Sequence, residues 1–179
     1  MRVITGAAKG CRLETPEGLD TRPTAERVKE GIFSAICFDI EGRRVLDLFA
    51  GSGQMGIEAL SRGARSCVFV DRSRQAVEVI RRNLRSSKTE AVSEVICGDS
   101  VAYLSRTQGT FDLVFLDPPY AAELAPSCLE RLADCVAVGG TVICESDRDT
   151  VLPETFGDLV LYRTYRYGRV TVRLYRKKG

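Results

Sequence analysis

The chain has 179 residues, of which 28% are charged, and a formal net charge of +2 at pH 7. It lacks both an apolar run near the roughly 20 residues of a membrane span and the pattern of a secretory signal, so we expect a cytoplasmic protein. Seven widely spaced cysteines and the absence of histidine argue against a zinc site or a disulfide framework and remove the usual general base, and we predict no metal.

In chain order, residues 1–16 have the glycines and alternation of a hairpin, and a helix is predicted to begin near Thr24. Apolar strand-length runs then alternate with helical patterns. Strands are predicted at 44–49, 66–71, 93–98, 111–117 and 140–145, and helices at 53–62, 73–86, 99–106 and 123–136. An antiparallel strand pair turning near Gly168 ends the chain.

This alternation predicts an α/β fold with a doubly wound, Rossmann-like parallel sheet covered by helices on both faces. We expect one domain. Residues 1–40 would form an N-terminal hairpin and helix that bind the substrate, and residues 41–179 a cofactor-binding catalytic core. The C-terminal strand pair would extend the sheet.

Glycines after the first core strand predict a cofactor loop. Gly51, Gly53 and Gly56 have G-x-G-x-x-G spacing at the start of a helix, where backbone amides can approach a ligand. This spacing alone does not separate a dinucleotide from S-adenosyl-methionine. Asp47, in the preceding strand, would repel a pyrophosphate and attract the ammonium of an amino-acid cofactor, which favours S-adenosyl-methionine.

Two further acids follow the next strands. Asp71 can accept hydrogen bonds from both ribose hydroxyls, and Asp99 can bind the adenine amino group, cap the following helix, or do both. The cofactor contacts that we predict are Asp47, Phe49, Ala50, Gly51, Ser52, Gly53, Asp71 and Asp99.

The fourth strand ends in "LDPPY", and its carboxyl end should lie beside the glycine loop. An aromatic amine is a poor nucleophile until acceptors hold its hydrogens and localise its lone pair. The Asp117 carboxylate and the Pro118 carbonyl can accept those hydrogens, Pro119 helps to fix the turn, and Tyr120 can stack on the base. We therefore predict Asp117, Pro118, Pro119 and Tyr120 as catalytic residues.

Basic residues are concentrated at the two ends of the chain, where few or no acids oppose them. The alternation of basic, apolar and aromatic residues in "RTYRYGRVTVRLYRKK" suits a strand pair with one cationic face, and a polyanionic partner is expected. In the N-terminal segment, the residues predicted to contact such a partner are Arg2, Lys9 and Arg12.

"LDLFAGSG" and "LDPPY" resemble the motifs of class I S-adenosyl-methionine-dependent methyltransferases that modify exocyclic amines of bases. "MRVITGAAKGCRLETPEGLDTRPTAERVKEGIFSAI" and "GIEALSRGA" are similar to the 16S ribosomal RNA guanine-N2 methyltransferases that act on guanine 966 of the small subunit, and the resemblance covers nearly the whole chain. It implies a Rossmann-like enzyme, cofactor contacts from the acids and glycines named above, and 16S rRNA, in the small subunit or its assembly intermediate, as the partner. It also places Arg22, Thr24 and Arg27 near the substrate. We expect a monomer.

Two alternatives remain open. A DNA adenine-N6 or cytosine-N4 methyltransferase would share "DPPY", although such enzymes usually need a further target-recognition domain. A nicotinamide-dependent oxidoreductase would share only the glycine spacing, and Asp47 together with the absence of histidine counts against it.

Overall fold

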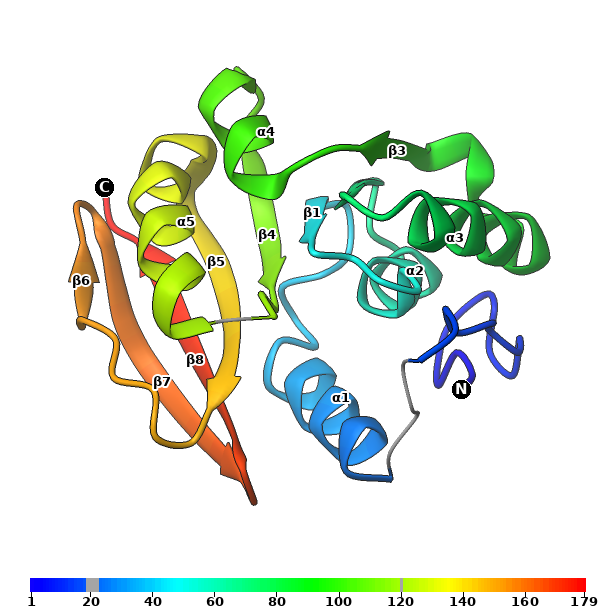
Figure 1. Ribbon diagram of the computed structural model, residues 1–179, viewed down its shortest axis with the longest axis horizontal. Coiled ribbons are helices and arrows are strands. Elements are labelled where there is room, and N and C mark those ends of the chain that lie inside the picture. Colours follow the sequence, from blue (N-terminus) through cyan, green and yellow to red (C-terminus); the bar gives the residue numbers. More distant parts are fainter. Residues whose placement is uncertain (19–22, 120) are drawn as a thin grey trace.

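The computed structural model of the protein describes residues 1–18, 23–119 and 121–179. Its helices are α1 (Pro23–Ala35), α2 (Gln54–Ser61), α3 (Arg74–Ser87), α4 (Ser100–Arg106) and α5 (Ala121–Cys135), with a short 3-10 turn at Glu90–Val92 (Figure 1). Its strands are β1 (Arg44–Leu48), β2 (Ser66–Asp71), β3 (Ser93–Cys97), β4 (Phe111–Leu116), β5 (Val136–Asp147), β6 (Thr155–Phe156), β7 (Leu159–Tyr167) and β8 (Val170–Lys177). In the described part of the chain, no helix combines the length and apolarity needed to span a membrane.

The eight strands of the described residues form one sheet in the order β3-β2-β1-β4-β5-β8-β7-β6. The pairs from β3 to β5 are parallel, whereas β8, β7 and β6 are added as antiparallel strands. From β1 the strand order runs outward through β2 to β3, and then β4 and β5 are added on the other side of β1. The order therefore reverses at β1, which lies at the centre of the parallel part. In open sheets of this kind, ligands bind beyond the carboxyl ends of the strands at this reversal.

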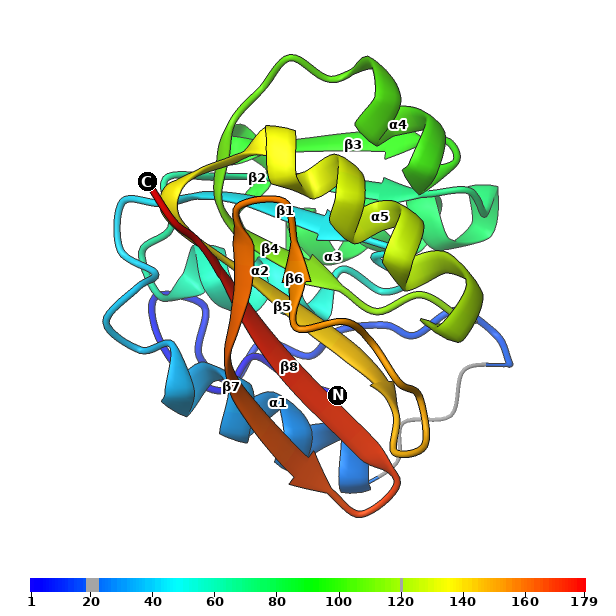
Figure 2. The same cartoon turned by 90° about the vertical axis from the view of Figure 1, so that its left-hand side faces the viewer.

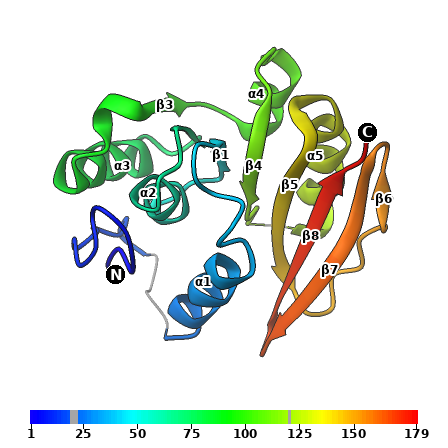
Figure 3. The same cartoon turned by 180° about the vertical axis from the view of Figure 1, so that it is seen from behind.

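Helices cover both faces of the sheet (Figures 2 and 3). One core contains residues of α1, α2 and α3, including the contact between Phe33 and Phe115, whose ring centroids are 5.6 Å apart. The other contains residues of α4 and α5, with Leu129 and Leu132 fully buried. Burial on both faces explains why the central strands are nearly continuous apolar runs. The predicted doubly wound sheet with antiparallel C-terminal strands is confirmed.

The largest difference from the predicted elements is in β5, which begins at Val136 rather than near residue 140. Its pairing with β4 shifts between Phe111 and Leu113, as at a β-bulge. Gly139 has φ of 78°, and a side chain at Gly140 would collide with Val136. Two adjacent glycines suggest a turn in sequence, but here they let one strand bend without ending.

The predicted N-terminal hairpin is present as a compact loop that is paired at one antiparallel bridge, Arg2 with Arg12. The amide of Val3 donates to the carbonyl of Cys11 at 2.9 Å, and that of Leu13 to Met1 at 3.0 Å. Val3 and Leu13 are buried and join the α1–α3 core. We call residues 1–14 the N-terminal hairpin; it lies beside α2 and α3, on the opposite side of α1 from the C-terminal strands (Figures 1 and 3).

Candidate active site at the carboxyl edge of the sheet

The loop between β1 and α2 has the backbone conformation that the glycine spacing predicts. Gly51 and Gly53 have φ of 59° and 76°, values that only glycine adopts without strain. Phe49 also has a positive φ, 56°, and such strain typically costs ~1–3 kcal/mol and is concentrated at functional sites. The third glycine has a packing role, because a side chain at Gly56 would collide with the ring of Phe69 on β2.

Asp71 closes this loop against the end of β2. Its carboxylate accepts hydrogen bonds from the amides of Gly51 and Ser73, both at 2.9 Å. The side chain is half-buried, so acceptor capacity remains on the open side. Asp71 is therefore held where it could accept ribose hydroxyls, and the same bonds fix the position of the glycine loop.

Asp47 lies beneath the loop and is only 3% exposed. Its Oδ2 accepts a hydrogen bond from the amide of Gly56 at 2.9 Å. Desolvation raises the pKa of Asp47 to about 8, and the charges of Asp117 and Asp71 add to the rise, against the hydrogen bond from Gly56. A cation bound nearby would lower that pKa again and stabilise the carboxylate, which is the response expected of a site for an ammonium or a sulfonium group.

Asp99 caps α4, one of the two roles that the sequence left open. Its side chain accepts from the amide of Ala102 at 2.8 Å, and the residue is exposed. A contact with adenine stays a prediction. The next residue, Ser100, is buried and its Oγ accepts from the amide of Phe49 at 3.4 Å, so the start of α4 reaches the glycine loop.

The remaining residues of the loop are arranged by backbone contacts. Ala50 is buried, and its amide donates to the carbonyl of Val70 at 3.1 Å. Ser52 is 6% exposed, and its carbonyl accepts from Nδ2 of Asn83 at 2.9 Å. Sequence reasoning did not single out Asn83, because an asparagine on a helix is ordinarily a solvated residue.

Asp117, Pro118 and Pro119 follow β4 directly, whereas Tyr120 lies outside the described residues. Because Leu48 pairs with Leu116, the "DPP" segment lies next to the end of β1. Asp117 is exposed at the edge of the sheet. Desolvation nevertheless raises its pKa to about 6, and the charge of Asp147 adds to the rise. Because this pKa lies below 7, the ionised form prevails at neutral pH.

Glu145 is a member of this site that the sequence analysis missed. It follows Cys144, the partner of Leu116 on β4, so it lies at the same edge as Asp117. Burial raises the pKa of Glu145 well above its usual range, and the charges of Asp117 and Asp47 contribute. The sequence pattern that could have indicated Glu145 is an acid near the end of a buried strand, as in "LDPPY". Asp47, Asp117 and Glu145 thus place three acids at this edge of the sheet, and in the described residues they do not form a metal-binding cluster.

The predicted RNA contacts have different outcomes. Four of them are exposed in the structure: Arg2, Lys9, Arg12 and Arg27. Thr24 lies in the first turn of α1, and Arg22 falls outside the described residues. Contact with RNA stays a prediction for all of them.

Comparisons with known proteins agree with this geometry. Residues 1–176 match the family model described as Conserved hypothetical protein 95. YlbH of Bacillus subtilis is 41% identical over 184 residues, with both chains covered completely. Ribosomal RNA small subunit methyltransferase D of Escherichia coli K12 is 30% identical over 181 residues, which cover 100% of this chain and 91% of the relative.

Solved structures show the same fold. The structure of yhhF from Escherichia coli has a TM-score of 0.88 at 29% identity, covering 100% of this chain and 98% of that one. The resemblance to ribosomal RNA methyltransferases that the motifs indicated is confirmed over the full length. The chain belongs to the Conserved hypothetical protein 95 family, together with relatives named ribosomal RNA small subunit methyltransferase D.

Proposed function

We propose that this protein transfers a methyl group from S-adenosyl-methionine to the exocyclic N2 amine of one guanine, of the guanine 966 type, in 16S rRNA. The observation that carries the proposal is the "DPP" segment at the end of β4, next to a glycine loop on β1. Full-length relatives named small subunit rRNA methyltransferases support RNA as the substrate. The choice of guanine N2 rests on the family resemblance of the motifs.

The residues at the carboxyl edge fit this cofactor better than a dinucleotide. Burial and the neighbouring acids disfavour the ionised form of Asp47, and a bound sulfonium or ammonium cation would stabilise that form whereas a pyrophosphate would not. A ligand could approach the glycine loop closely, because Gly51 and Gly53 carry no side chains, and Asp71 could hold the ribose. When bound, S-adenosyl-methionine supplies an electrophilic methyl group.

The chain's own residues would prepare the amine. The Asp117 carboxylate and the Pro118 carbonyl accept hydrogen bonds from the two N–H groups of the N2 amine, which localises the nitrogen lone pair toward the methyl donor. As the nitrogen becomes bonded to the methyl group it turns cationic, and the nearby carboxylate stabilises that charge. The surplus proton then passes to Asp117 or to water, so no histidine is needed.

RNA would be held by the N-terminal 40 residues acting as an extension of one methyltransferase domain. Enzymes that act on a base take it out of its stack, and RNA loops offer unstacked bases. The exposed arginines of the N-terminal hairpin would neutralise phosphates beside the target, in isolated 16S rRNA or in an assembling subunit. We expect a cytoplasmic monomer.

The test is methyl transfer from labelled S-adenosyl-methionine to small ribosomal subunits that lack the modification, followed by nucleoside mass spectrometry. N2-methylguanosine in 16S rRNA is the expected product. Label in DNA adenine or cytosine would support methylation of an exocyclic amine by the "DPPY" segment but would contradict 16S rRNA as the substrate. Failure to label either nucleic acid would contradict the reaction itself.

Asp117→Asn sharpens this test. We expect kcat to fall ~10²–10³-fold, because a preorganised acceptor of charge is lost, while cofactor affinity changes little. In the wild type, kcat should also fall as the pH drops below about 6, where Asp117 becomes protonated. The variant should lose that dependence. Equal losses of kcat and of cofactor affinity would contradict the proposal that Asp117 acts on the target amine and not on the cofactor.

A further inference from the structure

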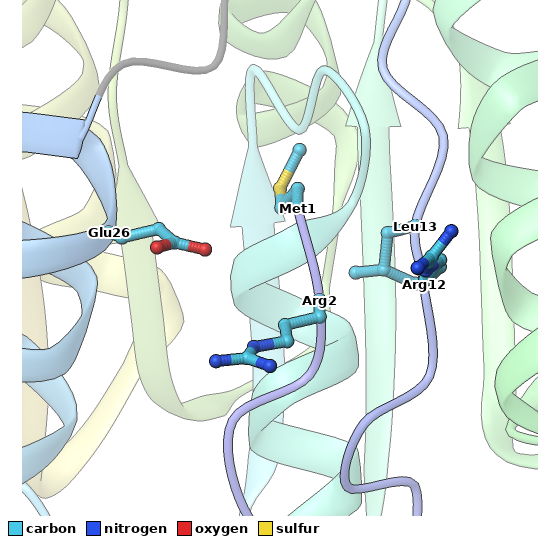
Figure 4. A pocket seen from close by; sticks show the side chains of 5 residues that line it. All are labelled: Met1, Arg2, Arg12, Leu13 and Glu26. Atoms are coloured by element: carbon cyan, nitrogen blue, oxygen red, sulfur yellow. The ribbon is translucent and has the colours of Figure 1, made fainter.

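A pocket of about 380 Å³ separates the N-terminal hairpin from α1. It is lined by Met1, Arg2, Arg12, Leu13 and Glu26 (Figure 4). Glu26 extends from α1 toward the hairpin, and Arg2 extends from the hairpin toward α1. Oγ of Ser52 donates to the sulfur of Met1 at 3.8 Å, so one wall touches the glycine loop. The pocket therefore adjoins the candidate active site without including its acids.

The two arginines offer binding places for anions. The antiparallel bridge sets Arg2 opposite Arg12, and like charges directly opposite one another are destabilising. In the part of the chain that the structure describes, neither side chain forms an ion pair. The backbone beneath them is fixed, since Nζ of the buried Lys29 donates to the carbonyl of Arg2 at 3.3 Å. The two guanidinium groups point to different sides in Figure 4, so each could bind its own phosphate with charge-assisted hydrogen bonds.

The rest of the pocket suits a base. Met1 and Leu13 provide apolar contacts, and the volume is at the small end of the range for ligand sites, which is appropriate for one nucleotide. Glu26 is a carboxylate that forms no ion pair among the described residues. An ionised carboxylate only accepts hydrogen bonds, so it favours a base that presents an amino group and disfavours a uracil carbonyl.

We propose that this pocket binds the RNA nucleotide next to the target guanine, with flanking phosphates on Arg2 and Arg12 and an exocyclic amino group of its base on Glu26. The inference rests on the proposed function for its substrate class and adds a position at which sequence is read. The phosphate contacts set register, and the contact with Glu26 discriminates between bases.

The first experiment measures binding rather than turnover, so it does not depend on methyl transfer. Four RNA hairpins carry the target guanine with cytidine or uridine at the 5′ or the 3′ neighbour, and the Kd of each is measured for the full chain. At one of the two neighbouring positions, we expect the RNA with cytidine to bind about tenfold more tightly than the RNA with uridine, which is the difference typical of one charge-assisted hydrogen bond. Glu26→Gln should reduce that ratio to within about twofold of unity. Glu130→Gln, a change at an exposed acid on α5, should preserve it.

The second experiment tests the phosphate contacts. Arg2→Gln and Arg12→Gln should each weaken all four RNAs to a similar degree and lower the slope of log Kd against log salt by about one. Arg43→Gln, at an exposed arginine before the amino end of β1, should change neither quantity. The affinity for S-adenosyl-methionine without RNA should stay unchanged in Arg2→Gln and Glu26→Gln.

Three results would overturn the inference. The first is equal affinity for RNAs with cytidine and with uridine at both neighbouring positions, and the second is a preference for cytidine that persists in Glu26→Gln. The third is weaker binding of S-adenosyl-methionine, measured without RNA, in Arg2→Gln or Glu26→Gln, which would assign the pocket to the amino-acid end of the cofactor. Failure of the proposed function would instead show as normal base discrimination without N2-methylguanosine.

Discussion

The two ends of the chain are both rich in arginine, yet they are attached to the fold in different ways. The C-terminal strands are part of the sheet, where seven residue pairs join β8 to β5 from Thr141–Arg176 to Asp147–Val170. The N-terminal hairpin has one bridge of its own, buries Val3 and Leu13 in the core, and is bonded mainly to side chains of α1, α2 and α3. A ladder distributes its stability over many backbone bonds, whereas the attachment of the hairpin depends on a few buried polar groups.

Glu58 is the main point of that attachment. It is fully buried on α2 and accepts from the amides of Ile4 at 2.8 Å and Thr5 at 3.0 Å. It also pairs with Lys29 at 3.2 Å and with Arg62 at 2.9 Å. One carboxylate therefore joins the N-terminal hairpin to two helices, and the comparison between the two ends can be tested by removing it.

Glu58→Ala should have the largest effect. It leaves Lys29 buried without its partner and two amides without acceptors, and we expect a loss of ~3–5 kcal/mol in the free energy of unfolding, measured with urea. Glu78→Ala is the matched control, because its pair with Arg81 is exposed and should contribute less than ~1 kcal/mol. Similar losses in the two variants would show that the hairpin does not depend on this carboxylate.

Asn83→Ala should have the next largest effect. Asn83 accepts from the amide of Glu14 at 2.7 Å and donates to the carbonyls of Glu14 and Ser52, both at 2.9 Å. Its removal should cost ~1–3 kcal/mol and weaken binding of both RNA and cofactor, because the hairpin and the glycine loop share this side chain. Ser87→Ala on the same helix serves as the control, since Ser87 bonds only to groups of α3 and to Thr89. A change in RNA affinity alone would disprove the shared role.

Tyr175→Phe tests the other end with a smaller change. Tyr175 is fully buried on β8, and its hydroxyl donates to the carbonyl of Pro153 at 2.9 Å. We expect a loss of ~0.5–1.5 kcal/mol in stability and unchanged binding of RNA and cofactor, because the ladder holds the strand in place. Tyr162→Phe, at an exposed position of β7, should be nearly neutral. Loss of RNA binding in Tyr175→Phe would mean that the strand pair is as sensitive as the hairpin.

Mild acid should have the smallest effect, because a lowered pKa keeps the Glu58 carboxylate ionised until the pH falls below the usual range of a glutamate. Desolvation acts upward on this group, but the hydrogen bond from Ile4 and the charge of Lys29 outweigh it and lower the pKa of Glu58 below 4.5. A lowered folded-state pKa stabilises the fold above pH 4.5, and the contribution is lost as the pH falls further. The amide resonances of Ile4 and Thr5 should shift in that range while those of β8 stay unchanged. Coincident shifts would indicate global unfolding.

The sequence predicted the elements that local patterns determine. Strands with apolar residues on both faces, the glycine loop and "LDPPY" are contiguous signals, and the parallel sheet brings them together at one edge. Glu145 belongs to the same class of signal and could have been found as an acid near the end of a strand next to β4.

The attachments of the N-terminal hairpin could not be predicted, because they join residues far apart in the chain. Glu58 and Ile4 are separated by 54 positions, and Asn83 and Glu14 by 69. Glutamate and asparagine on a helix usually face solvent, and only the packing of the hairpin over α2 and α3 buries them. The extension of β5 through Gly139 and Gly140 could not be predicted for a similar reason. It depends on pairing with β4, a strand from another part of the chain, whose register shift accommodates the bend.

The position of β8 also has a consequence for biosynthesis. β8 lies between β5 and β7 in the sheet, although it follows both of them in the chain. Until it emerges from the ribosome, β7 has no neighbour through which to join the sheet, and β5 presents an open edge in a nascent chain. Such edges recruit other strands, so we expect this stage of synthesis to be the most prone to aggregation and the most dependent on chaperones.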